Sequence, residues 1–291
     1  MTPIPQNAIM DAFIAACRGE LDAPKPGNVH VFADGHGMTV DHFLRSAEVA
    51  ARPLCQHGAK VGARIFGAVE ATSASVGQNT NLGIVLLCAP LAAAAEAADA
   101  FGGDLRQSLK ATLADLTRAD AEAAFAAIVL ANPAGLGGAA RHDVREGAET
   151  TLLEAMREAA ARDRIAYQYA SDYADVFGIG VKALETAADR GWLAPWPAVC
   201  VYLAYLAAFP DSHVARKHGA AAAEALQTAA AGVRDSFMSR GEAADTLADL
   251  LDFDRRLKAD GLNPGTSADL TVATLFADHL TRILIQRGNN G

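Results

Sequence analysis

Six polar segments of this sequence carry the side chains whose types and spacing could do chemistry. The first reads APKPGNVH over residues 23–30, where two prolines hold Lys25 in an extended conformation and Gly27 permits a sharp turn. Rigid backbone of this kind is suited to presenting a lysine ammonium, with Asn28 beside it, to an anion. A solvated lysine in an ordinary connection between helices explains the same residues.

The second segment reads DGHGMTVDHF over residues 34–43, a glycine-rich loop that runs into a helix which Thr39 could cap. His36 lies between two glycines, and nothing apolar around it requires a histidine. Asp41 would complement the positive end of the following helix, so it has a structural explanation beside a chemical one. We therefore expect His36 to be the more informative residue of the loop.

The third segment reads TSASVGQNTNLG over residues 72–83 and changes abruptly into an apolar helix. Asn79 or Thr80 could cap that helix, whose first N–H groups would then point at any approaching anion. Capping explains one such residue, but it does not explain Gln78, Asn79, Thr80 and Asn81 together. We therefore expect this loop to be functional.

The fourth segment, residues 132–146, is a glycine-rich loop followed by charged residues. Its glycines would let backbone approach a phosphate, but the P-loop pattern is missing and no predicted strand precedes it. His142 and Asp143 are adjacent and would diverge by about 100° on a helix, which argues against a metal site made by these two alone. An ordinary long loop also explains the segment.

The fifth segment reads DSHVARKHG over residues 211–219. On a helix, His213, Arg216 and Lys217 would share one face and could neutralise a phosphate. A solvated helix face capped by Asp211 accounts for the segment equally well.

The sixth segment reads NPGTSADL over residues 263–270 and leads into the final amphipathic helix. Thr266 and Asp269 have the spacing of a capping box, with Asp in the place of the usual Glu. The capping box alone accounts for Asp269 without any substrate.

The elements that must position these segments are helices. The 291 residues are 51% hydrophobic, alanine is the commonest residue, and alternating β-branched or aromatic clusters are almost absent. We predict an all-α fold, a single domain over residues 1–291 built as a multi-helix bundle. Two stretches, residues 84–91 and 199–209, are apolar almost all round and are predicted to form its buried central helices.

Charge and targeting signals narrow the function classes. The formal charge of −9 gives no field that would hold a polyanion, so we exclude nucleic acid as a partner. The longest apolar run, residues 82–95, is shorter than the roughly 20 residues needed to cross a bilayer, so no membrane association is expected. The first residues lack the pattern of a secretory signal, which predicts a cytoplasmic protein. A homodimer is compatible with the sequence.

Taken together, the segments resemble the triphosphoribosyl-dephospho-CoA synthase family, an all-helical group. The resemblance rests on four stretches that occur in order, KPGNVH at 25–30, GQNTNLG at 77–83, DSHVARKHG at 211–219 and PGTSADL at 264–270. It implies an ATP-dependent transferase that moves a triphosphoribosyl group from ATP to the ribose 2′-hydroxyl of dephospho-CoA and releases adenine. It also implies Mg²⁺ on the phosphates.

The sequence departs from the citrate-lyase and malonate-decarboxylase branch of that family at the third motif. That branch has NTHKG there, whereas this chain has Asn81 and Leu82 in place of the histidine and lysine. The NTNLG form suits a separate branch, found with genes for one-carbon carrier cofactors. Two alternatives therefore stay open: a same-fold enzyme with another acceptor, and a non-catalytic protein that binds a phosphorylated cofactor.

Breaking the bond between ATP ribose C1′ and adenine N9 develops positive charge on the sugar and negative charge on the base. The site therefore needs a carboxylate near the ribose, a proton donor near adenine, and cations for the triphosphate. The candidates for each role form a long set. Lys25, Arg216, Lys217 and His213 are expected at the phosphates, Asn28, Gln78, Asn79, Thr80 and Asn81 at the phosphates or ribose, Asp211 and Asp269 at Mg²⁺, Glu70, Asp143 and Asp41 as acid or base, and His36 and His142 as donors to adenine.

Overall fold

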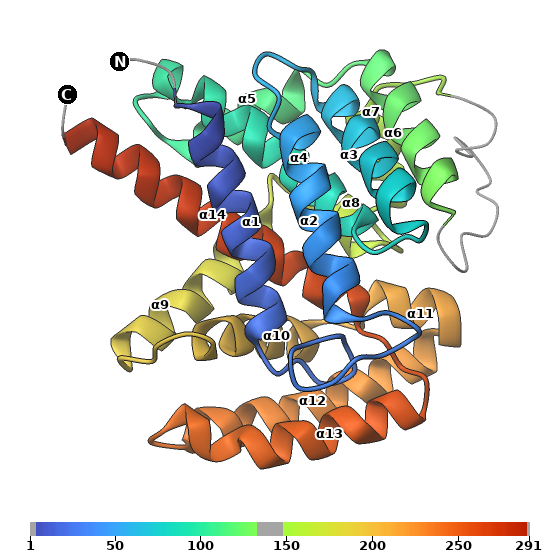
Figure 1. Ribbon diagram of the computed structural model, residues 1–291, viewed down its shortest axis with the longest axis vertical. Helices are drawn as coiled ribbons and strands as arrows, with labels where there is room; N and C mark the ends of the chain where they lie inside the picture. The colour runs from blue at the N-terminus through green and yellow to red at the C-terminus, as the bar shows by residue number, and fades with distance from the viewer. Residues whose placement is uncertain (1–3, 133–147, 290–291) are drawn as a thin grey trace. The chain divides into compact units, whose positions relative to one another are not determined.

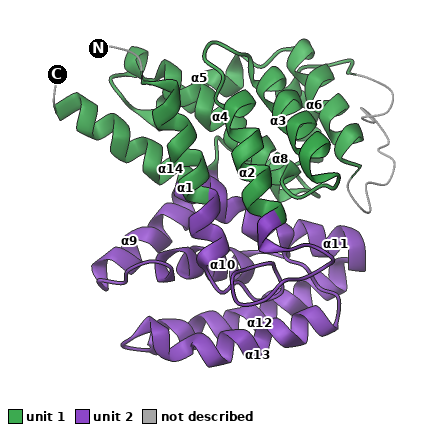
Figure 2. Cartoon of the chain, in the orientation of Figure 1, with its two compact units in different colours: residues 1–16, 42–173, 276–291 green, residues 17–41, 174–275 purple. Residues whose placement is uncertain are grey.

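The computed structural model describes residues 4–132 and 148–289 of the chain. Within these residues every regular element is a helix, and the extended backbone is limited to two isolated bridges. The all-α prediction is confirmed. The chain divides into two compact units, unit 1 with residues 1–16, 42–173 and 276–291, and unit 2 with residues 17–41 and 174–275 (Figure 2). The prediction of one domain over residues 1–291 stays a prediction.

Unit 1 contains most of the helices from the first half of the chain (Figure 1). Its helices are α2 (Val40–Leu54), α3 (Val61–Val76), α4 (Leu82–Ala97), the 3₁₀ turn η1 (Ala98–Phe101), α5 (Leu105–Ala114), α6 (Arg118–Ala131), α7 (Leu152–Ala159) and α8 (Arg164–Ala170). The first helix, α1 (Gln6–Asp22), and the last, α14 (Gly265–Asn289), each contribute residues to both units, and the first two residues of α2 belong to unit 2.

Unit 2 contains the helices that surround the first, fifth and sixth polar segments. They are the π-helical turn η2 (Val176–Gly180), α9 (Val181–Asp189), α10 (Trp196–Ala208), α11 (Ser212–His218), α12 (Ala220–Ser239), the 3₁₀ turn η3 (Ala243–Thr246) and α13 (Leu247–Ala259). Within the unit, α12 packs against α10 and α11 (Figure 1).

The two predicted central helices are buried. In α4 every residue from Ile84 to Ala92 is buried, and in α10 the run from Ala198 to Leu203 is buried as well. The stretch Leu82–Phe101 is long and apolar enough to cross a membrane, and 67% of it is buried inside the chain. Helices α10 and α11 together form a second apolar stretch of sufficient length, but the chain bends by 51° between them. Most of the apolar side chains of α4 and α10 are thus buried inside the protein.

Helix α4 tolerates a proline in its interior because tyrosines from outside the helix replace the missing hydrogen bond. Pro90 has no N–H, so the carbonyl of Leu86 lacks its usual partner four residues later. The hydroxyl of Tyr169 donates to Leu86 O at 2.6 Å, and that of Tyr173 donates to Leu87 O at 2.8 Å. Burial raises the pKa of both phenols, so both stay protonated donors.

Helices α3 and α6 approach each other closely at Gly62. A Cβ on Gly62 would lie 2.5 Å from the Cα of Asp120, a distance that no side chain tolerates. The Gly62 N–H donates to Asp120 Oδ1 at 2.8 Å, while Asp120 also closes a capping box with Thr117 at the start of α6. One carboxylate therefore fixes the contact between the two helices.

Candidate functional site

The segment from Lys25 to Met38 in unit 2 folds as two tight turns. Residues 30–33 form the first, in which His30 and Ala33 exchange backbone hydrogen bonds of 3.2 and 2.9 Å. Residues 35–38 form the second, in which Gly35 and Met38 do the same at 3.2 and 2.9 Å. We call residues 25–38 the double-turn segment.

Lys25 is the innermost residue of the double-turn segment and is fully buried. Its ammonium donates to the Glu20 carboxylate, to Asn28 Oδ1 at 3.0 Å and to Val29 O at 2.7 Å. Burial lowers the pKa of Lys25 and raises the pKa of Glu20, while the contact between them opposes both changes. All three donors of the ammonium are used inside the protein in this geometry, and the role of Lys25 at the phosphates stays a prediction.

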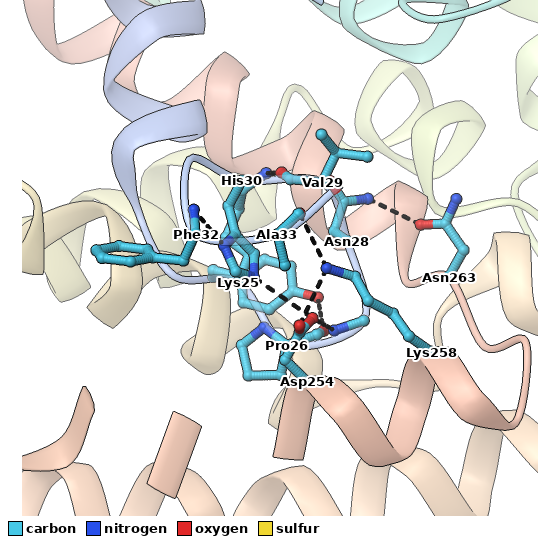
Figure 3. Close-up of polar contacts among 12 residues, drawn as sticks. Lys25, Pro26, Asn28, Val29, His30, Phe32, Ala33, Asp254, Lys258 and Asn263 are labelled. Carbon is cyan, nitrogen blue, oxygen red and sulfur yellow. Dashed lines mark hydrogen bonds and ion pairs between the residues drawn. The ribbon is translucent and has the colours of Figure 1, made fainter. Parts of the chain in front are cut away.

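Asn28 is likewise engaged within unit 2. Its Oδ1 accepts from Lys25, and its Nδ2 donates to Asn263 Oδ1 at 2.8 Å (Figure 3). The side chain is 6% exposed. Asn28 therefore ties the segment to the turn before α14, and the structure gives it a positioning role where the sequence predicted a ligand.

Asp254 on α13 organises the double-turn segment, although nothing in the sequence singled it out. Its Oδ1 accepts from the Gly27 N–H at 2.8 Å and lies 3.4 Å from His30 Nε2, and its Oδ2 pairs with Lys258 Nζ at 3.0 Å (Figure 3). Burial raises the pKa of Asp254, but the contacts with His30, Gly27 and Lys258 outweigh burial and hold that pKa below its ordinary value. The carboxylate is therefore ionised at neutral pH.

Lys258 and His30 complete this network. Lys258 Nζ also donates to Ala33 O at 3.0 Å, and the Phe32 N–H donates to His30 Nδ1 at 3.3 Å. Burial lowers the pKa of His30, which favours the neutral ring with its proton on Nε2 facing Asp254. The signal that could have revealed the network is the i, i+4 spacing of Asp254 and Lys258 on a predicted helix.

Gly27 occupies a position that only glycine can take. Its φ of +84° lies in the left-handed region, and an added Cβ would lie 2.8 Å from Pro264 Cδ. Beside it, the hydroxyl of the buried Tyr202 donates to Pro26 O at 2.6 Å. The PGNVH and PGTSADL stretches of the sequence therefore meet inside unit 2.

His36 occupies the second turn of the double-turn segment. It has a φ of +56°, which is unusual for a residue other than glycine, and Gly37 follows with a φ of +75°. Its ring nitrogen Nε2 lies 2.8 Å from Gly27 O and, since a carbonyl only accepts, must carry the proton. His36 is half-buried.

Asp211 fixes the starts of two helices. Its Oδ1 accepts from the His213 and Val214 N–H groups at 2.9 and 3.2 Å, and its Oδ2 accepts from the Ser267 N–H and hydroxyl, both at 2.8 Å. The predicted cap of α11 is confirmed. With both oxygens occupied by four donors and the side chain 1% exposed, Asp211 does not fit a direct Mg²⁺ ligand.

The capping box predicted for Thr266 and Asp269 is not formed. Helix α14 begins at Gly265, one residue before Thr266, and Thr266 Oγ1 accepts from the His213 N–H at 3.1 Å instead. The carboxylate of Asp211, which lies far away in the sequence, supplies the cap that local spacing predicted from Asp269. Asp269 is half-buried, and its charge acts on Lys25.

Cationic side chains gather on α11, and we call His213, Arg216, Lys217 and His218 the α11 basic group. Burial lowers the pKa of His213 to about 4, with smaller contributions from Arg216, Lys217, His36 and His218. His213 is thus neutral at pH 7, and the charge of the group comes from the exposed Arg216 and Lys217.

The four polar side chains of the third segment belong to unit 1, where each has a partner. Gln78 Nε2 bonds His42 Nδ1 at 3.0 Å, Thr80 bonds Ser46, and Asn81 Nδ2 donates to Thr72 Oγ1 at 3.0 Å. The N-cap of α4 is Asn81, whose side chain does not cap the helix, so the prediction of Asn79 or Thr80 as cap is wrong, although Asn79 Oδ1 accepts from the Leu82 N–H at 3.2 Å. Asn79 aside, these contacts hold the loop against α2 and α3.

The candidate acids and bases are dispersed. Glu70 lies exposed on α3 in unit 1, and Asp41 lies exposed in the first turn of α2. Asp143 and His142 lie outside the described residues. Unit 2 thus brings together Lys25, Asn28, His36, Asp211, His213 and Asp269. The residues described in the structure contain no group of three or more His, Cys, Asp or Glu arranged to hold a metal ion.

Comparison with known proteins first defines the class. The chain is similar to one described as "Crystal structure of putative triphosphoribosyl-dephospho-coA synthase from Archaeoglobus fulgidus", with a TM-score of 0.63, 23% sequence identity, and coverage of 80% of this chain and 96% of the other. This similarity shows a shared helical fold. No curated protein matches the chain.

The sequence model of the CitG family, described as ATP:dephospho-CoA triphosphoribosyl transferase, matches residues 6–287. The chain therefore belongs to the CitG family, and it is an enzyme of the triphosphoribosyl-dephospho-CoA synthase type with ATP as substrate. The resemblance seen in the sequence is confirmed.

Proposed function

We propose that this chain transfers the triphosphoribosyl group of ATP to the 2′-hydroxyl of dephospho-CoA, and that unit 2 holds the triphosphate against the α11 basic group. The observation that carries the proposal is the exposure of Arg216 and Lys217 next to the double-turn segment, whose His36 acts electrostatically on His213. Arginine and lysine at a surface are suited to binding phosphate oxygens. Lys25 and Asn28 contribute by fixing the backbone of this segment.

Mg²⁺ enters this proposal with the nucleotide. Magnesium commonly keeps several waters and is bound through substrate phosphates plus one or two carboxylates. Asp269 is the carboxylate that could approach it, because Asp211 is saturated by four donors. The metal would neutralise phosphate charge, while the residues of this chain bind and orient the nucleotide.

A binding experiment tests the location of the triphosphate. Arg216→Ala combined with Lys217→Ala should weaken the binding of ATP with Mg²⁺ at least tenfold, because each contact between a cation and phosphate contributes about 1.5–3 kcal/mol. Lys182→Ala is the matched control, since Lys182 is an exposed lysine on α9 of the same unit. Calorimetric titration measures both. Equal affinity of the double variant and the wild type would contradict the location.

A second acceptor class is favoured by one observation in unit 1. Where the family pattern noted above has histidine and lysine, this chain has the buried Asn81, bonded to Thr72, and the uncharged Leu82. The position carries no cation for the diphosphate of dephospho-CoA. An acceptor with fewer phosphates, such as a precursor of a one-carbon carrier cofactor, is therefore the second candidate.

Product analysis separates the two acceptors and the non-catalytic alternative. Wild-type protein with ATP, Mg²⁺ and dephospho-CoA should release free adenine and yield a product whose mass is that of the acceptor plus the triphosphoribosyl group. Adenine release only with a different hydroxyl acceptor supports the second candidate. Binding of ATP without adenine release under any of these conditions supports a binding protein and contradicts both.

The homodimer and the cytoplasmic location stay predictions from the sequence. Size-exclusion chromatography with light scattering of the purified chain tests the first.

A further inference from the structure

We infer that His36 is the catalytic base that removes the proton of the acceptor hydroxyl, and that it acts through Nδ1. This inference rests on the proposed function, because it assigns a role within the same transfer reaction. The sequence predicted His36 as a proton donor to adenine. The structure points to the opposite direction of proton transfer for this residue.

The hydrogen bond of His36 fixes the tautomer of its ring. His36 Nε2 lies 2.8 Å from the carbonyl oxygen of Gly27, and this contact requires the ring proton to be on Nε2. In the neutral ring Nδ1 then carries a lone pair and can only accept a proton. Among residues 4–132 and 148–289, Nδ1 of His36 makes no hydrogen bond. This nitrogen atom is not buried, so it is accessible to solvent.

The backbone at His36 is held in an uncommon conformation. His36 and Gly37 are the central residues of a turn closed by the Gly35 and Met38 hydrogen bonds, and both have positive φ, as in a type I′ turn. Asparagine or glycine would adopt the first position with less strain than histidine. Strained residues of this kind are concentrated at functional sites, where surrounding contacts maintain them.

The partner of His36 is itself fixed. Gly27 O faces His36 because the Gly27 N–H is bonded to Asp254 at 2.8 Å and its Cα is packed against Pro264. Asp254 therefore positions the carbonyl that selects the His36 tautomer. This chain of contacts has the arrangement of a base oriented by a second group, with a backbone carbonyl in the orienting role.

As the bond between C1′ and adenine N9 breaks, its electron pair leaves with adenine, and the acceptor oxygen forms a new bond to C1′. The acceptor proton moves to His36 Nδ1, and His36 then returns it to water while adenine takes up one proton. The sum is ATP plus acceptor hydroxyl giving triphosphoribosylated acceptor plus neutral adenine.

Titratable and charged groups of three elements lie near the segment that carries this ring. His213 on α11 interacts with it electrostatically, the stem of Lys258 on α13 lies 3.0 Å from the Cβ position of Gly35, and Asp34 of the same segment accepts from the Val40 N–H at 3.1 Å. The pH dependence of kcat alone would therefore report the titration of several groups together. Chemical rescue isolates the contribution of the His36 ring.

The experiment uses two variants of the full chain. His36→Asn keeps a residue that tolerates the turn but has no base, and His36→Gly opens a space for added imidazole. Both should bind ATP with an affinity within about threefold of the wild type and lower kcat at least about 100-fold, within the usual range for a lost acid or base. Imidazole should raise kcat of His36→Gly at least tenfold, in proportion to its unprotonated fraction.

The matched control is His57→Ala, which removes an exposed histidine from unit 1. Its kcat should equal that of the wild type, with or without imidazole. His36→Asn with more than half of the wild-type kcat would overturn the inference, and so would a folded His36→Gly variant that imidazole does not restore. Failure of the proposed function is distinguishable, because wild-type protein would then release no adenine before any variant is compared.

Discussion

Among the described residues, each compact unit contains a fully buried cation paired with a glutamate, and the two cations differ in what they can do. In unit 1, Arg64 donates to Ala59 O and Leu54 O at 2.9 and 3.0 Å and pairs with Glu96 at 2.9 Å. In unit 2, Lys25 pairs with Glu20 and donates to Val29 O. Both therefore close a backbone turn from inside.

The two cations differ in the chemistry of their charged groups. A guanidinium stays charged and spreads its donors over a fixed fork, so Arg64 can hold the connection between α2 and α3. The Lys25 ammonium is a point charge whose pKa is lowered by burial, and it holds the segment that carries His36. In unit 1 the buried charge therefore holds the connection between two helices, whereas in unit 2 the buried charge supports the segment that contains the candidate site.

The largest effect that would sharpen this comparison is expected for Arg64→Leu. The variant leaves Glu96 without its buried partner and two carbonyls without donors, so the free energy of unfolding should fall by about 3–5 kcal/mol. Urea unfolding followed by circular dichroism measures it. A loss below about 1 kcal/mol would show that the pair is dispensable and would break the comparison.

The next largest effect is expected for Lys25→Met. Its free energy of unfolding should fall by about 3 kcal/mol, because Glu20 is left buried and becomes protonated. The double variant Lys25→Met, Glu20→Gln should recover part of that loss, since it removes both charges. If the double variant is less stable than the single variant, the network beyond the pair, rather than the uncompensated charge, dominates.

The sequence predicted the helical class and the buried α4 and α10 because these depend on composition and local periodicity. The cap of α11 by Asp211 is also local and was predicted correctly, whereas the N-cap of α4 is Asn81 rather than Asn79 or Thr80. The interior position of Lys25 could not be predicted, because it depends on Glu20 and on partners more than 200 residues away, such as Asp254, which bonds Gly27. The same reason explains why a distant Asp211 replaced Asp269 at the start of α14.

Asp254→Asn should have a smaller effect, about 1–2 kcal/mol at pH 7, since the amide oxygen can still accept from Gly27 while the charge that faces Lys258 is lost. The pKa of Asp254 is lowered in the folded state, so its carboxylate stabilises the fold above the unfolded pKa and loses this contribution as pH falls through the folded pKa. The difference between wild type and variant should therefore narrow in acid. Denaturant curves at pH 7 and near pH 3 check it, and a difference that widens would contradict the assignment.

The smallest effect is expected for Lys60→Met. Lys60 pairs with Asp115 at 3.0 Å, but the two side chains are 71% and 76% exposed, so solvent screens the pair. The midpoint of urea unfolding should not change within error. A clear shift would mean that exposed and buried pairs cannot be ranked by burial, which would weaken the contrast drawn from Arg64 and Lys25.

The proline in α4 also has a consequence for synthesis on the ribosome. The carbonyls of Leu86 and Leu87 are made early, but the phenols that bond them belong to Tyr169 and Tyr173. Leu87 O can accept from the Leu91 N–H of its own helix, but Leu86 O faces Pro90, which has no N–H, and is left to water until Tyr169 has been made. Water can therefore be excluded from this part of α4, the most apolar helix of unit 1, only after the second half of the chain has begun to be synthesised.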